Sequence, residues 1–175
     1  MVHKRWGTSV FFLIFIFTFL TTWLTVCIFS VKVRGYRLER VIDGDTVVLD
    51  SGEKIRLLGI DAPDKGAVNS DIASVTLESI LKDNIVWLEG DRYRKDLYGR
   101  RLGWLWVSCE SKPRFRPDDY MEKHRRDDNF ENNPVGCEKG VLVNELMIKM
   151  DVVELYFPDG QGELKYEDRL KTASH

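Results

Sequence analysis

The longest hydrophobic run in the chain lies near its N-terminus, between Trp6 and Val31, and no charged residue interrupts it. As a helix, this run of roughly 26 residues would be about 39 Å long. About 20 apolar residues are enough to cross a bilayer. The pattern therefore predicts one transmembrane signal anchor over residues 9–31, after a short basic tail at residues 1–8.

A cleaved signal peptide is the alternative to an uncleaved anchor. The apolar part of such a peptide is usually about 7–15 residues long and ends at a small-x-small site. The run here is longer and ends in TVCIFSVKV, which contains no A-x-A site. The pattern favours the anchor, and a secreted form is expected only if the segment is cleaved.

Strand-like segments begin after the apolar run. Three short stretches are rich in strand formers and partly alternate between apolar and polar residues. They are YRLERVI (36–42), TVVLD (46–50) and EKIRLLGI (53–60). The DSG between the last two favours a tight turn, and DAPDKG ends the third. We expect these stretches to form an antiparallel meander.

The next segment, SDIASVTLESILKDN (70–84), has a helical period. Its apolar residues recur at the spacing of one helix face, and Ser70 or Asp71 is the expected N-terminal cap. The apolar face consists of Ala73, Leu77, Ile80 and Leu81.

Two further strands are expected, NIVWLEGD (84–91) and RRLGWLWV (100–107). Trp104 and Trp106 lie on one face of the second, and we interpret them as core residues rather than as a surface for stacking bases. The following segment, 108–139, carries many charges of both signs and several prolines, with little periodicity. It is interpreted as a surface insertion, partly disordered, in which His124 is solvated.

Order is expected to resume with VLVNELMIKM (141–150), a short helix with Leu142, Leu146 and Met150 on one side. An extended piece, DVVELYF, and a short C-terminal tail or helix at residues 161–175 follow. Several strands with two or three helices predict an α+β domain over residues 35–160, compatible with a small closed barrel.

The overall charge is nearly balanced, with a formal net charge of −2 in 175 residues. Nucleic-acid-binding domains often carry a basic excess, which is absent here. Any site for a polyanion must therefore be a local patch.

The cysteines bear on which side of the membrane the domain lies. The basic residues do not decide this, because they occur on both sides of the apolar run. Cys109 and Cys137 bracket the charged insertion. A disulfide between them would close a loop of about 29 residues and contribute roughly 3–4 kcal/mol. Two unrelated thiols are the alternative. Because disulfides form in oxidising compartments, the pair favours a domain outside the cytoplasm.

Acidic and basic residues gather around the predicted meander. Asp45 precedes one strand and Asp61 ends the next, so a meander would bring both carboxylates to one end of the barrel. Two carboxylates with a backbone carbonyl and waters suit Ca²⁺. Arg56 lies five residues before Asp61 on the expected third strand, and Arg100 opens a later strand. Such guanidiniums bind phosphate oxygens well.

The ordered set IDGDT, IRLLGIDAPD, DLYGRRLGWLWV and VNELM resembles the staphylococcal nuclease (thermonuclease-like) family. The resemblance covers about Tyr36 to Phe157, apart from the charged insertion. It implies a five-stranded OB-fold barrel with packed helices, and a Ca²⁺-dependent nuclease that hydrolyses DNA and RNA. A monomer is expected.

The resemblance also implies roles for individual residues. Asp45, Asp61 and the main-chain carbonyl of Ala62 fall on the metal ligands. The aromatic residue near the nucleotide falls on Tyr98, and an acidic neighbour in its loop on Asp96. The phosphate-binding pair falls on Arg56 and Arg100.

One position departs from the family pattern. The water-activating carboxylate after D-x-P is usually Glu in the family, and Asp64 occupies it here. The shorter side chain withdraws the carboxylate by roughly 1–1.5 Å, and a misplacement near 1 Å can cost on the order of 10²-fold in rate.

This departure keeps a second interpretation open beside the enzyme, a tethered OB-fold module that binds single-stranded nucleic acid or a protein ligand. A third, a structural membrane protein with a degenerate barrel, is less favoured. The sequence leaves open whether DNA or RNA is preferred, and what role the insertion has.

Overall fold

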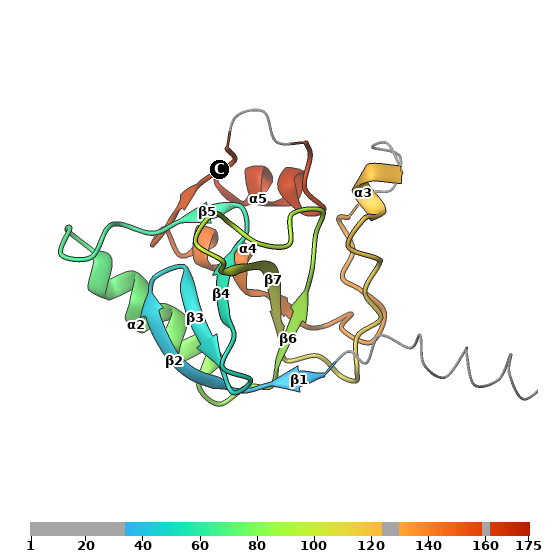
Figure 1. Cartoon of the computed structure of the whole chain (residues 1–175), viewed down its shortest axis with the longest axis horizontal. Helices are drawn as coiled ribbons and strands as arrows, with labels where there is room; N and C mark the ends of the chain where they lie inside the picture. Colours follow the sequence, from blue (N-terminus) through green and yellow to red (C-terminus); the bar gives the residue numbers. More distant parts are fainter. Residues whose placement is uncertain (1–33, 124–129, 159–161) are drawn as a thin grey trace, which may run out of the picture. The chain divides into compact units, whose positions relative to one another are not determined.

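The structure is a computed structural model that describes residues 34–123, 130–158 and 162–175 (Figure 1). The expected anchor, the basic tail and His124 lie outside these residues. Of the helices formed by the described residues, none has the length and apolar character needed to cross a bilayer.

A mixed sheet of seven strands forms the centre of the domain. Its strand order is β1-β6-β7-β4-β3-β2, with β8 paired to β7, and every neighbouring pair is antiparallel except β4 with β7. The strands are β1 (Gly35–Tyr36), β2 (Leu38–Asp43), β3 (Thr46–Leu49), β4 (Lys54–Leu57), β6 (Val86–Glu89), β7 (Arg101–Val107) and β8 (Val141–Leu142).

The two ends of this strand order are neighbours along the chain. β1 and β2 are separated by Arg37 alone, and together they cover the expected strand 36–42. β1 pairs with β6, and β2 pairs with β3. The stretch Gly35–Asp43 therefore pairs with β6 at one end of the strand order and with β3 at the other.

Helix α2 (Ser70–Leu81) confirms the predicted helix, and it packs against β2. Ala73, Leu77 and Leu81 are fully buried, as the helical period predicts. The predicted cap is wrong. The N-cap is Asn69, whose left-handed backbone (φ 69°) starts the helix without a side-chain cap bond.

Three further helices are short: α3 (Tyr120–Lys123), α4 (Val143–Lys149) and α5 (Glu167–Ala173). The structure thus confirms a mixed α+β fold. Helix α5 lies within the tail expected at residues 161–175 and packs against α4. The extended piece after α4 contains β9 (Glu154–Leu155), which pairs with β5 (Ile60–Asp61) in a separate two-stranded sheet.

The predicted apolar side of α4 is wrong. Leu142 is buried but belongs to β8, Leu146 is only half-buried, and Met150 is 51% exposed. The buried face instead includes Asn144, which donates to the Leu58 carbonyl at 2.8 Å and accepts from the Leu105 amide at 3.1 Å. These buried backbone partners fix the rotation of the helix.

Both predicted core tryptophans, Trp104 and Trp106, are fully buried on β7. Their indole N–H groups donate to Asp91 Oδ2 at 2.8 Å and Glu89 Oε2 at 3.0 Å. The core beside β7 therefore contains buried carboxylates as well as apolar side chains. The apolar and polar alternation along the strand does not predict these buried acids.

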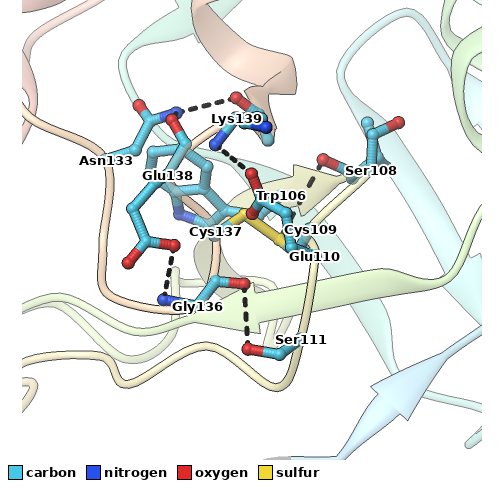
Figure 2. The surroundings of a disulfide bond; sticks show 12 residues. Trp106, Ser108, Cys109, Glu110, Ser111, Asn133, Gly136, Cys137, Glu138 and Lys139 are labelled. Carbon is cyan, nitrogen blue, oxygen red and sulfur yellow. Dashed lines mark hydrogen bonds between the residues drawn. A yellow bond between two sulfur atoms is a disulfide. The ribbon is translucent and has the colours of Figure 1, made fainter.

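The described parts of the charged insertion are tied to the domain. Cys109 and Cys137 form a disulfide, and Cys137 is fully buried (Figure 2). Arg114 and Val135 pair through their backbones, and Asn133 Nδ2 donates to the carbonyls of Glu138 and Gly140. The last of these bonds is 2.7 Å long. These bonds give the insertion a defined base.

Candidate functional site

The turn between β2 and β3 carries Asp45 and lies against α2 and the segment after β5. A Cβ atom at Gly44 would stand 2.7 Å from the Ala62 Cβ, so only glycine allows this approach. Asp45 is 5% exposed, and its Oδ2 accepts the Ala62 amide at 2.7 Å. The first predicted metal ligand is therefore buried and has a fixed orientation.

The expectation that Arg56 and Asp61 share one strand is wrong. β4 ends at Leu57, and Gly59 (φ 75°) makes a turn before β5. Five residues of straight strand would separate the two side chains by about 16 Å and turn them to opposite faces. The turn instead brings Asp61 Oδ1 to 2.5 Å from Arg56 Nη2, and the Ile60 carbonyl to 2.9 Å from Nη1.

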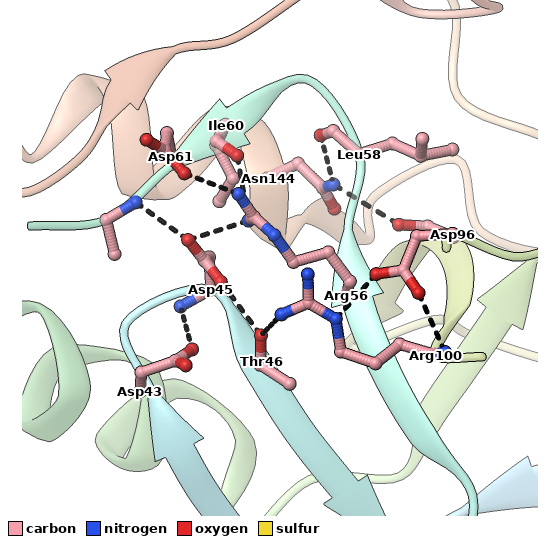
Figure 3. A network of polar contacts seen from close by, with 12 residues as sticks. Asp43, Asp45, Thr46, Arg56, Leu58, Ile60, Asp61, Asp96, Arg100 and Asn144 are labelled. Atoms are coloured by element: carbon pink, nitrogen blue, oxygen red, sulfur yellow. Dashed lines mark hydrogen bonds and ion pairs between the residues drawn. The ribbon is translucent and has the colours of Figure 1, made fainter. Parts of the chain in front are cut away.

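Arg56 joins the two predicted metal carboxylates. Its Nη1 lies 2.7 Å from Asp45 Oδ2 while its Nη2 contacts Asp61 (Figure 3). The guanidinium is nearly buried, at 9% exposure of the residue, whereas Asp61 is exposed. One carboxylate from the β2–β3 turn and one from β5 thus converge on one planar cation.

Arg100 lies beside this cluster at the start of β7. Its Nε donates to Asp96 Oδ2 at 2.6 Å, and its backbone amide donates to Asp96 Oδ1 at 2.9 Å. Its Nη1 donates to Thr46 Oγ1 at 3.3 Å, and that hydroxyl donates to Asp45 Oδ1 at 2.9 Å. Figure 3 shows the resulting continuous network from Asp61 to Asp96.

The carboxylates of this network have different pKa values for physical reasons. Burial raises the pKa of Asp45 to about 6, although the Arg56 charge opposes the shift. Burial would also raise the pKa of Asp96, but the hydrogen bonds and charge of Arg100 outweigh it and lower that pKa. Asp96 therefore remains an ionised partner for Arg100 in mildly acidic solution.

A shallow groove of about 320 Å³ opens beside Arg100. Tyr98 forms part of its wall and is 85% exposed, with the Arg100 Cζ 5.4 Å from the centre of its ring. The lining residues are Ile42, Asp43, Thr46, Lys54, Tyr98 and Arg100. An exposed aromatic ring beside a guanidinium can contact a base and its phosphate together.

The structure does not bring Asp64 into the network. It lies in the exposed loop between β5 and α2, where its backbone carbonyl accepts the Ala67 amide at 2.8 Å. Its side chain makes no hydrogen bond or ion pair with any residue of the described network. Ala62, by contrast, lies next to Asp45 through the amide contact already given.

The donor set fits a hard cation. In the described part of the chain, no three His, Cys, Asp or Glu side chains come together as a metal cluster. The carboxylates of Asp45 and Asp61 both contact Arg56, and the Ala62 amide contacts Asp45. Two carboxylates, one carbonyl and waters are an oxygen set that Ca²⁺ accepts.

A second ionic cluster lies outside the predicted site. Three charged residues are almost completely buried: Glu89 at the end of β6, Asp91 just after it, and Lys165 in the tail. Lys165 Nζ lies 3.1 Å from Glu89 Oε1. The Lys165 amide also donates to Asp91 Oδ2 at 2.9 Å. The only sequence signal was a pair of acids in WLEGD, where an apolar strand ends.

A cavity of about 430 Å³ is separate from the network around Arg56. It lies between α4, α5 and the insertion, and Glu145, Arg169 and Phe130 contribute to its wall. No residue predicted for the site lines it. The chemistry of the small open groove, rather than the size of this cavity, therefore identifies the candidate site.

Comparison with known proteins gives partial matches. No protein-family model matches the chain. It is 39% identical over 92 residues to a thermonuclease of Staphylococcus intermedius, covering 46% of this chain and 55% of the relative. A thermonuclease of Staphylococcus hyicus is 36% identical over 86 residues, with coverage of 44% and 51%. Protein ParB of Escherichia coli is 37% identical over 82 residues, with coverage of 45% of each chain.

The chain spans about half the length of the curated relatives it matches. Within that span, the two thermonucleases share more than a third of their residues with it. The motifs of the sequence that resemble this family are also those that supply Asp45, Arg56 and Arg100 to one network. Over the matched span, the chain is therefore similar to staphylococcal thermonucleases, in agreement with the resemblance of its motifs.

Proposed function

We propose that the protein is a Ca²⁺-dependent nuclease that hydrolyses phosphodiester bonds of DNA, RNA or both. The observation that carries the proposal is the convergence of Asp45 and Asp61 on Arg56. Arg100 is connected to Asp45 through the Thr46 hydroxyl. The similarity to two proteins named thermonuclease supports the same activity.

The two arginines are proposed to bind the phosphate. Arg100 is oriented by Asp96 through its Nε, which leaves its outer nitrogen, Nη2, without a partner among the described residues. Arg56 presents a planar fork at the same end of the sheet. Donors whose direction is fixed before the substrate binds stabilise the charge that develops on a phosphate in the transition state.

Asp45, Asp61 and the Ala62 carbonyl are proposed to hold Ca²⁺, which when bound neutralises phosphate charge and polarises its oxygens. Asp45 is fixed by the Ala62 amide and Thr46, and Asp61 is exposed, so the pair is accessible from solvent on one side. Asp64 is proposed as the general base that accepts a proton from the attacking water. The exposed Tyr98 is placed to contact the nucleotide.

A weakened module that binds single-stranded nucleic acid is the second candidate. The position of Asp64 favours it, because this carboxylate lies in an exposed loop and contacts no member of the network. The exposed Tyr98 and the two arginines would serve binding without turnover.

We also propose the OB-fold as the architecture. If Gly35–Asp43 counts as one strand, it pairs at one end with β6 and at the other with β3. Together with β4 and β7 this gives five strands in a ring of pairings, as in the predicted five-stranded barrel.

The proposed setting is a single-pass membrane protein whose domain lies outside the cytoplasm, with a secreted form if the N-terminal segment is cleaved. The apolar run supports membrane attachment. The disulfide between Cys109 and Cys137 supports an oxidising compartment. A monomer remains the expectation.

The test of the function is cleavage of single-stranded DNA and RNA by the full chain in detergent, with Ca²⁺ or with a chelator. We expect turnover that requires Ca²⁺ and falls by at least about 10²-fold in Asp45→Ala and in Arg56→Ala, since both act on the transition state. Full activity of Asp45→Ala would refute the metal assignment. Binding that persists in chelator, without product under either condition, would establish the second candidate instead.

A further inference from the structure

The hairpin that carries Arg100, residues 94–102, is closed by its own bonds, and at its tip Asp96 Oδ1 accepts the amides of Tyr98 and Arg100. The Leu102 amide donates to the Arg94 carbonyl and the Asp96 amide to the Arg100 carbonyl, both at 3.0 Å. The tip is open to solvent, since Leu97 is fully exposed. A two-stranded hairpin is only marginally stable alone. Asp96 orients Arg100 within the hairpin, so the position of the hairpin as a whole depends on what supports its base.

The charged insertion supports that base. Gly90 lies directly under the Asp118 carboxyl group, and a Cβ atom there would stand 2.6 Å from the Asp118 Cγ. Arg92 Nη2 donates to the Met121 carbonyl at 3.3 Å, and Arg94 Nε lies 3.7 Å from Asp118 Oδ2. The chain leading into the hairpin is thus covered by residues that lie far away in the sequence.

Lys165 supplies an independent connection between the same two segments. Its Nζ donates to the Gly90 carbonyl at 2.7 Å and to the Arg116 carbonyl at 3.0 Å, while pairing with Glu89. The lysine side chain is completely buried. A buried ammonium is costly to leave unpaired, so these backbone carbonyls are fixed partners.

We propose that residues 114–123 of the insertion, the bracing segment, position Arg100 by supporting the base of its hairpin. The proposal rests on the proposed function, because Arg100 is there the phosphate ligand. Asp118 is then a positioning residue that acts through Gly90 and the hairpin. The bracing segment makes substrate affinity depend on the docking of the insertion.

The test begins with Gly90→Ala in the full chain, because the backbone of Gly90 is not left-handed and accepts alanine. The new methyl group displaces the Asp118 carboxyl. We expect affinity for a single-stranded oligonucleotide to fall on the order of ten-fold, with KM rising by more than kcat falls. Hydrogen exchange at the Asp96 and Leu102 amides should accelerate, while the Leu49 amide in the β3–β4 hairpin keeps its rate.

Removal of the opposing carboxyl should repair the defect. In Gly90→Ala combined with Asp118→Gly, affinity and exchange should return to the values of Asp118→Gly alone. Asp119→Ala is the matched control, since Asp119 is a neighbouring exposed acid that pairs with Lys123 within the segment. It should leave both measurements unchanged.

Parental affinity and parental exchange rates in Gly90→Ala would overturn the proposal. So would a double variant no better than Gly90→Ala. Absence of cleavage by the parent chain refutes only the proposed nuclease, because oligonucleotide affinity and hydrogen exchange still report on the bracing segment.

Discussion

At the residue scale, the geometry of Arg56 decides what the site can do. Its Nη1 and Nη2 contact different carboxylates, Asp45 and Asp61, and a third bond goes to the Ile60 carbonyl. Only a planar fork with several donors in fixed directions makes these contacts together. The two acids that would hold a cation are therefore spaced by the same group that would bind phosphate.

Replacement of this fork tests its role. Arg56→Lys keeps the charge, but a single ammonium does not match both carboxylates and the carbonyl. We expect kcat/KM to fall by on the order of 10²-fold, as for the loss of one transition-state donor. Steady-state cleavage measures it. Arg101→Lys is the control, because Arg101 pairs with Glu53 at 3.4 Å outside the network. Equal effects of the two variants would contradict a special role for Arg56.

Substitution of Asp64 is expected to raise the rate of cleavage rather than lower it. Because its carboxylate is exposed and outside the network, the extra methylene of Asp64→Glu adds reach toward the site without a packing cost. We expect kcat to rise by about ten-fold or more, given that a 1 Å misplacement costs on the order of 10²-fold. Single-turnover cleavage at saturating Ca²⁺ measures the chemical step. A lower rate in Asp64→Glu than in the parent would exclude Asp64 as a base limited by its reach.

At the scale of elements, the turn at Gly59 brings the site together. Gly59→Ala should destabilise the fold by about 1–2 kcal/mol through its left-handed backbone alone. The new Cβ would also stand 2.7 Å from Leu170 Cδ2, and this close contact should destabilise the fold further. Activity should fall because the turn sets Asp61 against Arg56. Urea unfolding and cleavage assays measure both effects.

Gly52→Ala is the matched control for this turn. Gly52 also has a left-handed backbone, at φ 80°, but nothing lies within 4 Å of its Cβ position. It should lose stability through the backbone alone and keep its activity. If both variants lose activity equally, backbone strain rather than the Gly59 turn explains the loss.

The turn at Gly59 is also a feature that the sequence does not predict. Periodicity identified α2 and most strands, because apolar faces repeat at the period of each element. It read residues 53–60 as one strand, since a glycine inside an apolar run does not reveal its φ. The motifs identified Asp45, Arg56 and Arg100, but Glu89, Asp91 and Lys165 were missed. Those charges become buried only through tertiary contacts 76 and 74 residues apart in the sequence.

The disulfide gives a further prediction for the insertion. Reduction should lower the free energy of unfolding by about 3–4 kcal/mol on the chain-entropy model, since 28 residues separate the cysteines. The measurement is urea unfolding of Cys27→Ser with and without reductant, so that only Cys109 and Cys137 respond. The control is Cys27→Ser/Cys109→Ser/Cys137→Ser, which should not respond to reductant. Alkylation of both thiols in the unreduced protein would show that no bridge forms.

At the scale of the whole domain, buried charges connect distant parts of the chain. Glu89 accepts from Lys165, Trp106 and Tyr166, and so joins the sheet to the C-terminal tail. Lys165 in turn reaches the insertion through the Arg116 carbonyl. Removing one partner of such a group leaves the others buried and unpaired, which is strongly destabilising. We therefore expect the sheet, the tail and the insertion to unfold together.

This ionic interior predicts an unusual response to pH. Burial raises the pKa of Glu89 and of Asp91, although the Lys165 charge and hydrogen bonds oppose it. Folding then favours the protonated acids. Their contribution to stability is fully present below their ordinary pKa values of 4.5 and 3.8, and it is lost as pH rises through the raised values. The free energy of unfolding should therefore decrease as the pH rises from 4.5, the ordinary value of Glu89, through the raised pKa values.

Urea unfolding of the full chain across this range, in chelator, measures the slope. Acids with lowered pKa values, such as Glu145 and Asp96, do not oppose it, because their contributions are lost only at lower pH. Glu89→Gln should reduce the slope whatever its stability, since glutamine does not titrate, while Asp91 and Asp45 keep their part of it. Glu154→Gln, at an exposed strand position, should retain the parental slope. Stability that rises from pH 4.5 to 7 would mean that the Lys165 charge outweighs burial and keeps Glu89 ionised.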